Sequence, residues 1–157
     1  MNILIATCSK KLRNGKENPK NYPWWPELLH ELGMDFHVTQ IAAAGDRRYA
    51  ADYRVGLSMA DITKLVAECA FWVSVDSFLP HLAHHLGKPG VVLWAKSDPV
   101  IYGYPENLNL LKDRKYLRKS PFDIWEHETF DSAAFMSVPA IVSAVSGWYK
   151  PRVLKAA

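Results

Sequence analysis

The sequence has little cysteine and no long apolar run near its start, and both absences narrow the class of protein. Its two cysteines, Cys8 and Cys69, lie in or beside apolar segments and have no CxxC spacing. We expect reduced core residues rather than a disulfide framework, as in a cytoplasmic protein. The apolar run at the N-terminus is too short for a signal peptide or a membrane span. We therefore predict a cytoplasmic protein without a transmembrane segment.

Motifs that identify an enzyme class directly are also absent. The sequence contains no P-loop, no GxGxxG fingerprint and no Ser-His-Asp arrangement. His81, His84 and His85 have helical spacing, but no HExxH pattern or supporting acid accompanies them, so we expect no metal. The net charge of +3 is too small to favour a nucleic-acid partner. Positive charge gathers at residues 10–20 and 112–119, which fits either solvated loops or attraction of phosphates.

What the sequence does contain is an alternation of short apolar strands and amphipathic helices. Its 157 residues, 49% of them hydrophobic, suffice for a single domain with a sizeable core. Ser58 and Asp61 have the spacing of a helix capping box. We expect strands over residues 2–7, 36–41, 71–75, 90–94, 108–111 and 115–117, and helices over 22–32, 47–53, 59–68, 79–86 and 138–148. This order predicts an α/β fold, a three-layer Rossmann-like domain with a parallel sheet.

The most informative segment is residues 71–99, FWVSVDSFLPHLAHHLGKPGVVLWAKSDP. It predicts a buried strand, a polar turn at Asp76-Ser77-Phe78-Leu79, a short helix and a second buried strand. In open α/β sheets, ligands bind where a parallel strand ends and a helix begins, because free helix N–H groups face outward there. A carboxylate and a hydroxyl at that point suit a sugar, a ribose or a phosphate.

Several short motifs occur along the chain in one order and spacing. They are Lys20-Asn21-Tyr22-Pro23, Gly56-Leu57-Ser58-Met59-Ala60-Asp61, Asp76-Ser77, His81-Leu82-Ala83, Leu86-Gly87-Lys88-Pro89 and Ser97-Asp98-Pro99. Together they resemble the C-terminal, donor-binding half of the heptosyltransferase-type glycosyltransferases of family 9, which have the GT-B fold. The match is good over residues 1–105 and loose over 106–157, an irregular segment plus a C-terminal helix within the same domain.

The resemblance implies a nucleoside-diphosphate sugar as donor substrate or ligand, with no other cofactor. Ser9 and Lys20 would then meet the diphosphate, and Asp46 would lie near the ribose. The base would lie near Leu57 and Ser58. The turn under the phosphates would be formed by Asp76, Ser77, Phe78 and Leu79, with His81 lining the same pocket.

The sequence also departs from the family pattern. Phe78 stands where the family has a glycine that lets a phosphate approach the backbone, and Ala42 and Ala95 replace glycines after two strands. A GT-B enzyme has a second half that carries the acceptor site and the catalytic carboxylate, and the match covers only the donor half. Catalysis would therefore need an acceptor-domain protein or a homodimer. The alternatives are a non-catalytic protein that binds a nucleotide or a phosphorylated ligand, and an interaction scaffold.

Overall fold

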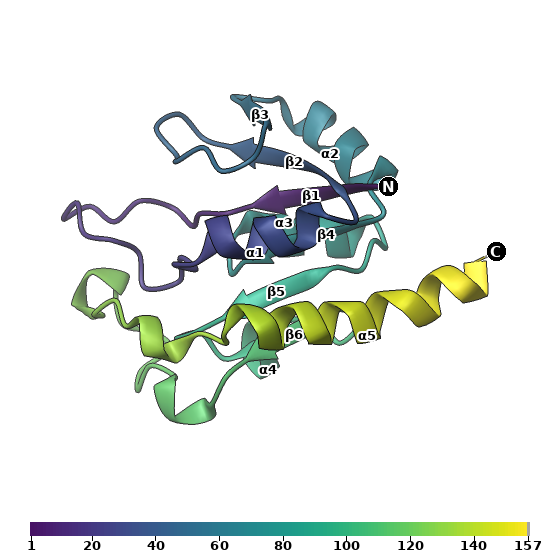
Figure 1. The fold of residues 1–157 in the computed structure, drawn as a ribbon. Helices are drawn as coiled ribbons and strands as arrows, with labels where there is room; N and C mark the ends of the chain where they lie inside the picture. The colour runs from purple at the N-terminus through teal and green to yellow at the C-terminus, as the bar shows by residue number, and fades with distance from the viewer. Residues whose placement is uncertain (157) are drawn as a thin grey trace.

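The computed structural model describes residues 1–156, with side chains through Lys150, and contains one six-stranded sheet (Figure 1). All strands are parallel, in the order β3-β2-β1-β4-β5-β6. The strands are β1 (Asn2–Ala6), β2 (His37–Ala42), β3 (Asp52–Val55), β4 (Phe71–Val75), β5 (Val91–Trp94) and β6 (Leu108–Leu111). The helices are α1 (Trp25–Gly33), α2 (Met59–Glu68), α3 (Phe78–His85), α4 (Pro99–Tyr102) and α5 (Val138–Ala156). The predicted Rossmann-like α/β fold is confirmed.

Helices cover both faces of the sheet, which gives three layers. Alternate residues of the central strands, such as Ile3 and Ile5 of β1, face α1 and α5, and these two helices lie side by side in front of the sheet in Figure 1. Leu4 and Ala6 of the same strand face the other core, which contains Val66 of α2 and Leu79 of α3. Burial on both faces explains why β5 is apolar throughout its length and why β4 is apolar except at Ser74.

The last helix, α5, packs on this sheet through Ile141 and Val145, which are almost fully buried. By length and composition alone, Ser132–Lys150 also meets the criteria for a membrane-spanning helix. A helix that packs in a protein core can meet the same criteria.

Two local predictions were wrong. Residues 47–53 form no helix, because the buried amide of Gln40 holds the segment open: its Oε1 accepts from the N–H groups of Tyr49 (2.8 Å) and Ala50 (3.1 Å). The chain then enters β3 as an edge strand. Residues 115–117 form no strand; a 3-10 helix, η1 (Arg114–Tyr116), begins after Asp113, whose carboxylate accepts from the Lys115 N–H.

The segment between β6 and α5 contains two further 3-10 helices, η2 (Trp125–His127) and η3 (Ser132–Ala134). The other predicted elements occur within a few residues of their predicted bounds, except that α5 continues past the predicted end at residue 148 to Ala156. Ser58 caps α2 as expected, with its Oγ accepting from the Asp61 N–H at 3.1 Å. The Asp61 carboxylate accepts from the Ser58 hydroxyl at 2.6 Å, in place of the backbone N–H that a capping box would use.

Candidate functional site

The candidate site lies where the chain direction across the sheet reverses, between β1 and β4. After β1 the chain leads to α1 on one face, and after β4 it leads to α3 on the other face. The two strand ends are tied together by a hydrogen bond from Ser9 Oγ to the Asp76 carbonyl oxygen, at 3.1 Å. Such a reversal leaves a crevice at the carboxyl ends of the strands, which is the usual ligand position in this class of sheet.

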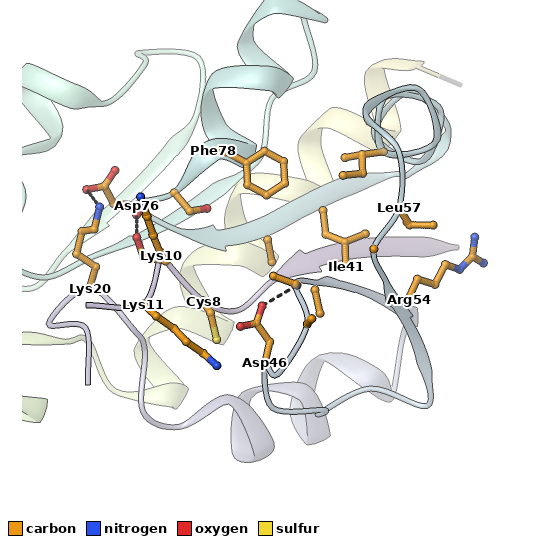
Figure 2. A pocket seen from close by; sticks show the side chains of 18 of the residues that line it. Cys8, Lys10, Lys11, Lys20, Ile41, Asp46, Arg54, Leu57, Asp76 and Phe78 are labelled. Atoms are coloured by element: carbon orange, nitrogen blue, oxygen red, sulfur yellow. Dashed lines mark hydrogen bonds and ion pairs between the residues drawn. The ribbon is translucent and has the colours of Figure 1, made fainter. Parts of the chain in front are cut away.

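A cavity of about 740 Å³ opens at this point (Figure 2). Its walls come from the segments that follow β1, β2, β3 and β4. Small side chains at the end of β2 leave the space open. The lining residues are Ala6, Cys8, Ser9, Lys10, Lys11, Lys20, Ile41, Ala42, Ala43, Ala44, Asp46, Arg54, Gly56, Leu57, Ile62, Asp76, Ser77, Phe78 and His81.

One end of the cavity is cationic. Lys20 Nζ lies 3.3 Å from Asp76 Oδ2, and both side chains are about 15% exposed. The same carboxylate oxygen accepts a hydrogen bond from Ser97 Oγ at 2.5 Å, so Asp76 is fixed from two sides. Lys10 lies nearby in Figure 2, and its ammonium has no hydrogen-bond or ion-pair partner among the described residues.

The start of α3 adds oriented N–H donors to this end. Ser77 precedes the helix, but its hydroxyl contacts Ser74 Oγ at 3.0 Å and does not cap the helix. The first N–H groups of α3, at Phe78 and Leu79, therefore have no side-chain partner. An uncapped helix N-terminus beside a lysine has the charge and the donors that bind a phosphate group.

The other end of the cavity is apolar. Ile41 and Leu57 line it, and the Phe78 ring lies between this end and the cationic end in Figure 2. The Phe78 side chain is 46% exposed, so the ring stands at the cavity surface instead of being packed in the core. A flat aromatic group entering the cavity would meet these three side chains.

Eight of the ten predicted site residues line this cavity, and two do not. The side chain of Leu79 is fully buried in the core between the sheet and α3, and Leu79 does not line the cavity. Ser58 is committed to capping α2. Ala95 is also buried in the core, and the replacement of glycine there does not affect the cavity.

Sequence reasoning missed several lining residues. Lys10 and Lys11 were visible only as part of a basic loop, and Arg54 fell in a segment predicted as loop rather than β3. Cys8, expected in the core, is partly exposed and lines the cavity, and partial burial raises the pKa of its thiol. Arg54 is committed to Asp52, which it contacts at 2.9 Å, and this hydrogen bond lowers the pKa of that carboxyl to about 2.

His81 is held at the cavity wall by a neighbouring loop. Its Nδ1 lies 2.8 Å from the Tyr104 hydroxyl, and the Tyr104 ring stacks on His84 at 3.8 Å between centroids. His84 in turn contacts the Glu106 carboxylate, which lowers the pKa of Glu106. No cluster of three or more metal-ligating side chains occurs in the part of the chain that the structure describes.

A model of glycosyltransferase family 9 (heptosyltransferase) matches residues 41–121, more than half of the chain. The chain belongs to this family. The predicted resemblance is thereby confirmed at the level of the family. No curated protein matches the sequence.

Solved structures of heptosyltransferases share the fold of this family member. The E. coli ADP-heptose LPS heptosyltransferase II has a TM-score of 0.66 at 17% identity, over 96% of this chain and 47% of that protein. E. coli heptosyltransferase WaaC with ADP gives 0.54 at 20% identity, over 68% and 36%. Dodecameric iron-containing TibC from enterotoxigenic E. coli, with ADP-D-β-D-heptose, gives 0.56 at 17%, over 87% and 35%. The chain therefore spans about half the length of heptosyltransferase II and about a third of the length of WaaC and TibC.

Proposed function

We propose that the cavity binds the diphosphate and nucleoside of a nucleotide sugar, and that this chain is the donor-binding part of a glycosyltransferase. The proposal depends on one observation: Lys20, held by Asp76, lies beside the uncapped start of α3, at the point where the chain direction across the sheet reverses. Membership of family 9, and the ADP and ADP-heptose bound to the WaaC and TibC structures, support the same ligand class.

The two ends of the cavity give the ligand a direction. The diphosphate lies at the cationic end, near Lys20 and Lys10, and the nucleoside extends toward Leu57 and Ile41. Asp46 lies between the ends and has one carboxylate oxygen in use, accepting from the Ala43 N–H at 2.8 Å. Its other oxygen is the acceptor that a ribose hydroxyl would use.

In glycosyl transfer these groups would act on the leaving group. As the sugar–phosphate bond breaks, negative charge grows on the departing diphosphate, and Lys20 and the α3 N–H groups stabilise it. A carboxylate that deprotonates the acceptor would come from an acceptor-domain protein or a second copy of this chain.

Calorimetric titration of the purified chain with ADP, GDP and UDP tests the proposal. Binding of at least one of them is expected, with a higher melting temperature in its presence. Lys20→Ala removes the ammonium that would contact the diphosphate, so this variant should lose binding. Lys64→Ala is the matched control, because Lys64 lies on α2, is 74% exposed and does not line the cavity. Failure of all three nucleotides to bind would refute the proposal.

The second candidate is a protein that binds the nucleotide without transferring sugar. Phe78 favours it, because the ring stands where close approach of a phosphate to the backbone needs a small residue. Incubation of the purified chain with a nucleotide sugar distinguishes the two. Turnover by the chain alone would exclude the binding-only function, whereas turnover only after addition of an acceptor-domain protein would support the donor-binding role.

A further inference from the structure

Lys20 has a second partner outside the cavity. Its ammonium lies over the ring of Trp125, 4.9 Å from the centroid, while it also contacts Asp76 at 3.3 Å. Trp125 begins η2, which is more than a hundred residues away in the sequence and lies beyond residues 41–121 that the family model matches. The two partners leave the Lys20 side chain only 15% exposed.

The same short helix holds the loop that carries Lys20. The Glu126 carboxylate accepts from the Arg13 N–H at 3.1 Å, and the Glu126 carbonyl accepts from Asn14 Nδ2 at 3.4 Å. Thus η2 contacts the loop between β1 and α1 at three points, once through the lysine and twice near its middle.

The Trp125 ring also contacts a second cation, Arg118, which precedes it in the sequence. The guanidinium of Arg118 lies 4.2 Å from the centroid of its ring. The Arg118 side chain is 4% exposed and forms an ion pair with Glu128 at 3.6 Å. The backbone N–H of Arg118 donates to the Lys96 carbonyl at 3.0 Å. The ring is therefore anchored, through Arg118, to the segment that follows β5.

We propose that Trp125 is a positioning residue that holds the Lys20 ammonium at the cationic end of the cavity. A lysine has four rotatable bonds, and fixing them before a ligand arrives removes an entropic cost of binding. Asp76 alone would fix the ammonium but would also offset its charge. An aromatic face attracts the cation through its quadrupole and adds no formal negative charge, so it orients Lys20 while leaving it cationic toward an anion. That the anion is a diphosphate rests on the proposed function.

The position of Lys20 can be measured without any ligand. In the ¹H–¹³C NMR spectrum, the Lys20 ε-methylene protons should be shifted upfield by the ring current of Trp125. Trp125→Phe should retain part of this shift, and Trp125→Leu, which keeps an apolar side chain without a ring, should abolish it. Ordinary lysine shifts in the wild-type chain, or shifts that Trp125→Leu leaves unchanged, would overturn the proposal.

The effect on binding is measured by a double-mutant cycle with ADP as the probe. Trp125→Leu should weaken binding about 3- to 20-fold, and Trp125→Phe should restore most of it. In the Lys20→Ala background, Trp125→Leu should have no further effect, whereas an equal loss in both backgrounds would show a merely structural role and overturn the proposal. If the ring-current shift is present but ADP, GDP and UDP do not bind the wild-type chain, the proposed function fails and the positioning of Lys20 stands.

Discussion

The two ends of the cavity are built in different ways. The apolar end comes from side chains on or next to regular elements, such as Ile41 at the end of β2 and Leu57 just before α2. The cationic end is assembled from loops, with Lys20 held by Asp76 after β4 and by Trp125 in η2. Shape at the apolar end follows from the core, whereas charge at the cationic end depends on a few long-range contacts.

Under the proposed function this difference has a consequence for binding. The cationic end would recognise phosphate, which all nucleoside diphosphates share, and the apolar end would recognise the base. A substitution at the cationic end should weaken every diphosphate equally. A substitution at the apolar end should change the preference among nucleotides and leave inorganic pyrophosphate unaffected.

Removal of Lys20 should have the largest effect. A partly desolvated ammonium that contacts a phosphate contributes about 1.5–3 kcal/mol, so Lys20→Ala should weaken both ADP and pyrophosphate about 10- to 100-fold. Calorimetry on the variant and on Lys64→Ala measures this. Loss of ADP binding with unchanged pyrophosphate binding would contradict the division between the two ends.

Replacement of Phe78 should have an intermediate effect. If the half-exposed ring stacks on the base, Phe78→Ala should weaken ADP binding about 5- to 10-fold and leave pyrophosphate binding unchanged. Phe78→Tyr, which keeps the ring, is the matched control. An increase in ADP affinity in Phe78→Ala would show instead that the ring obstructs the cavity.

Loss of Arg54 should change nucleotide affinity least. Its guanidinium lines the cavity but is paired with Asp52 through two hydrogen bonds, at 3.0 and 2.9 Å. We expect the Kd of Arg54→Ala for ADP to stay within about twofold of the wild-type value, because Arg54 lies on the Leu57 side of the cavity, away from Lys20 and the proposed diphosphate position (Figure 2). A loss as large as that of Lys20→Ala would place the diphosphate at the wrong end.

The same pair makes stability sensitive to acid. Because the Asp52 pKa falls to about 2 in the folded chain, the unfolded chain binds the extra proton between about pH 4 and pH 2. The stability from this carboxyl is present above pH 4 and is lost as pH falls toward 2. Urea unfolding between pH 5 and pH 2.5 should therefore show a steeper decline in the wild-type chain than in Arg54→Ala. Equal slopes would contradict the pKa assignment.

The sequence predicted the fold well because the signal is local. Apolar runs such as Phe71–Val75 and the capping pair Ser58 and Asp61 determine strands and helix starts within a few residues. The turn after Val75 was located for the same reason. Arg47–Tyr53 was misassigned because Gln40, a buried polar side chain outside the segment, determines its conformation.

The cationic end was predicted only in part. Asp76 was predicted from its position between a buried strand and a helix, and Lys20 from the family resemblance, but their ion pair joins residues 56 positions apart and leaves no trace in local spacing. The contact of Trp125 with Lys20 was not predicted, since it depends on a 3-10 helix that the irregular pattern after β6 did not indicate. Contacts between loops of distant origin require the tertiary structure.

A crystal structure of the chain with a saturating nucleoside diphosphate is the most direct test of the central claim. The account predicts phosphate oxygens within hydrogen-bond distance of Lys20 Nζ and of the first N–H groups of α3, with the base between Leu57 and Phe78. Density for the nucleotide in the reverse orientation, or at a place other than this cavity, would contradict it.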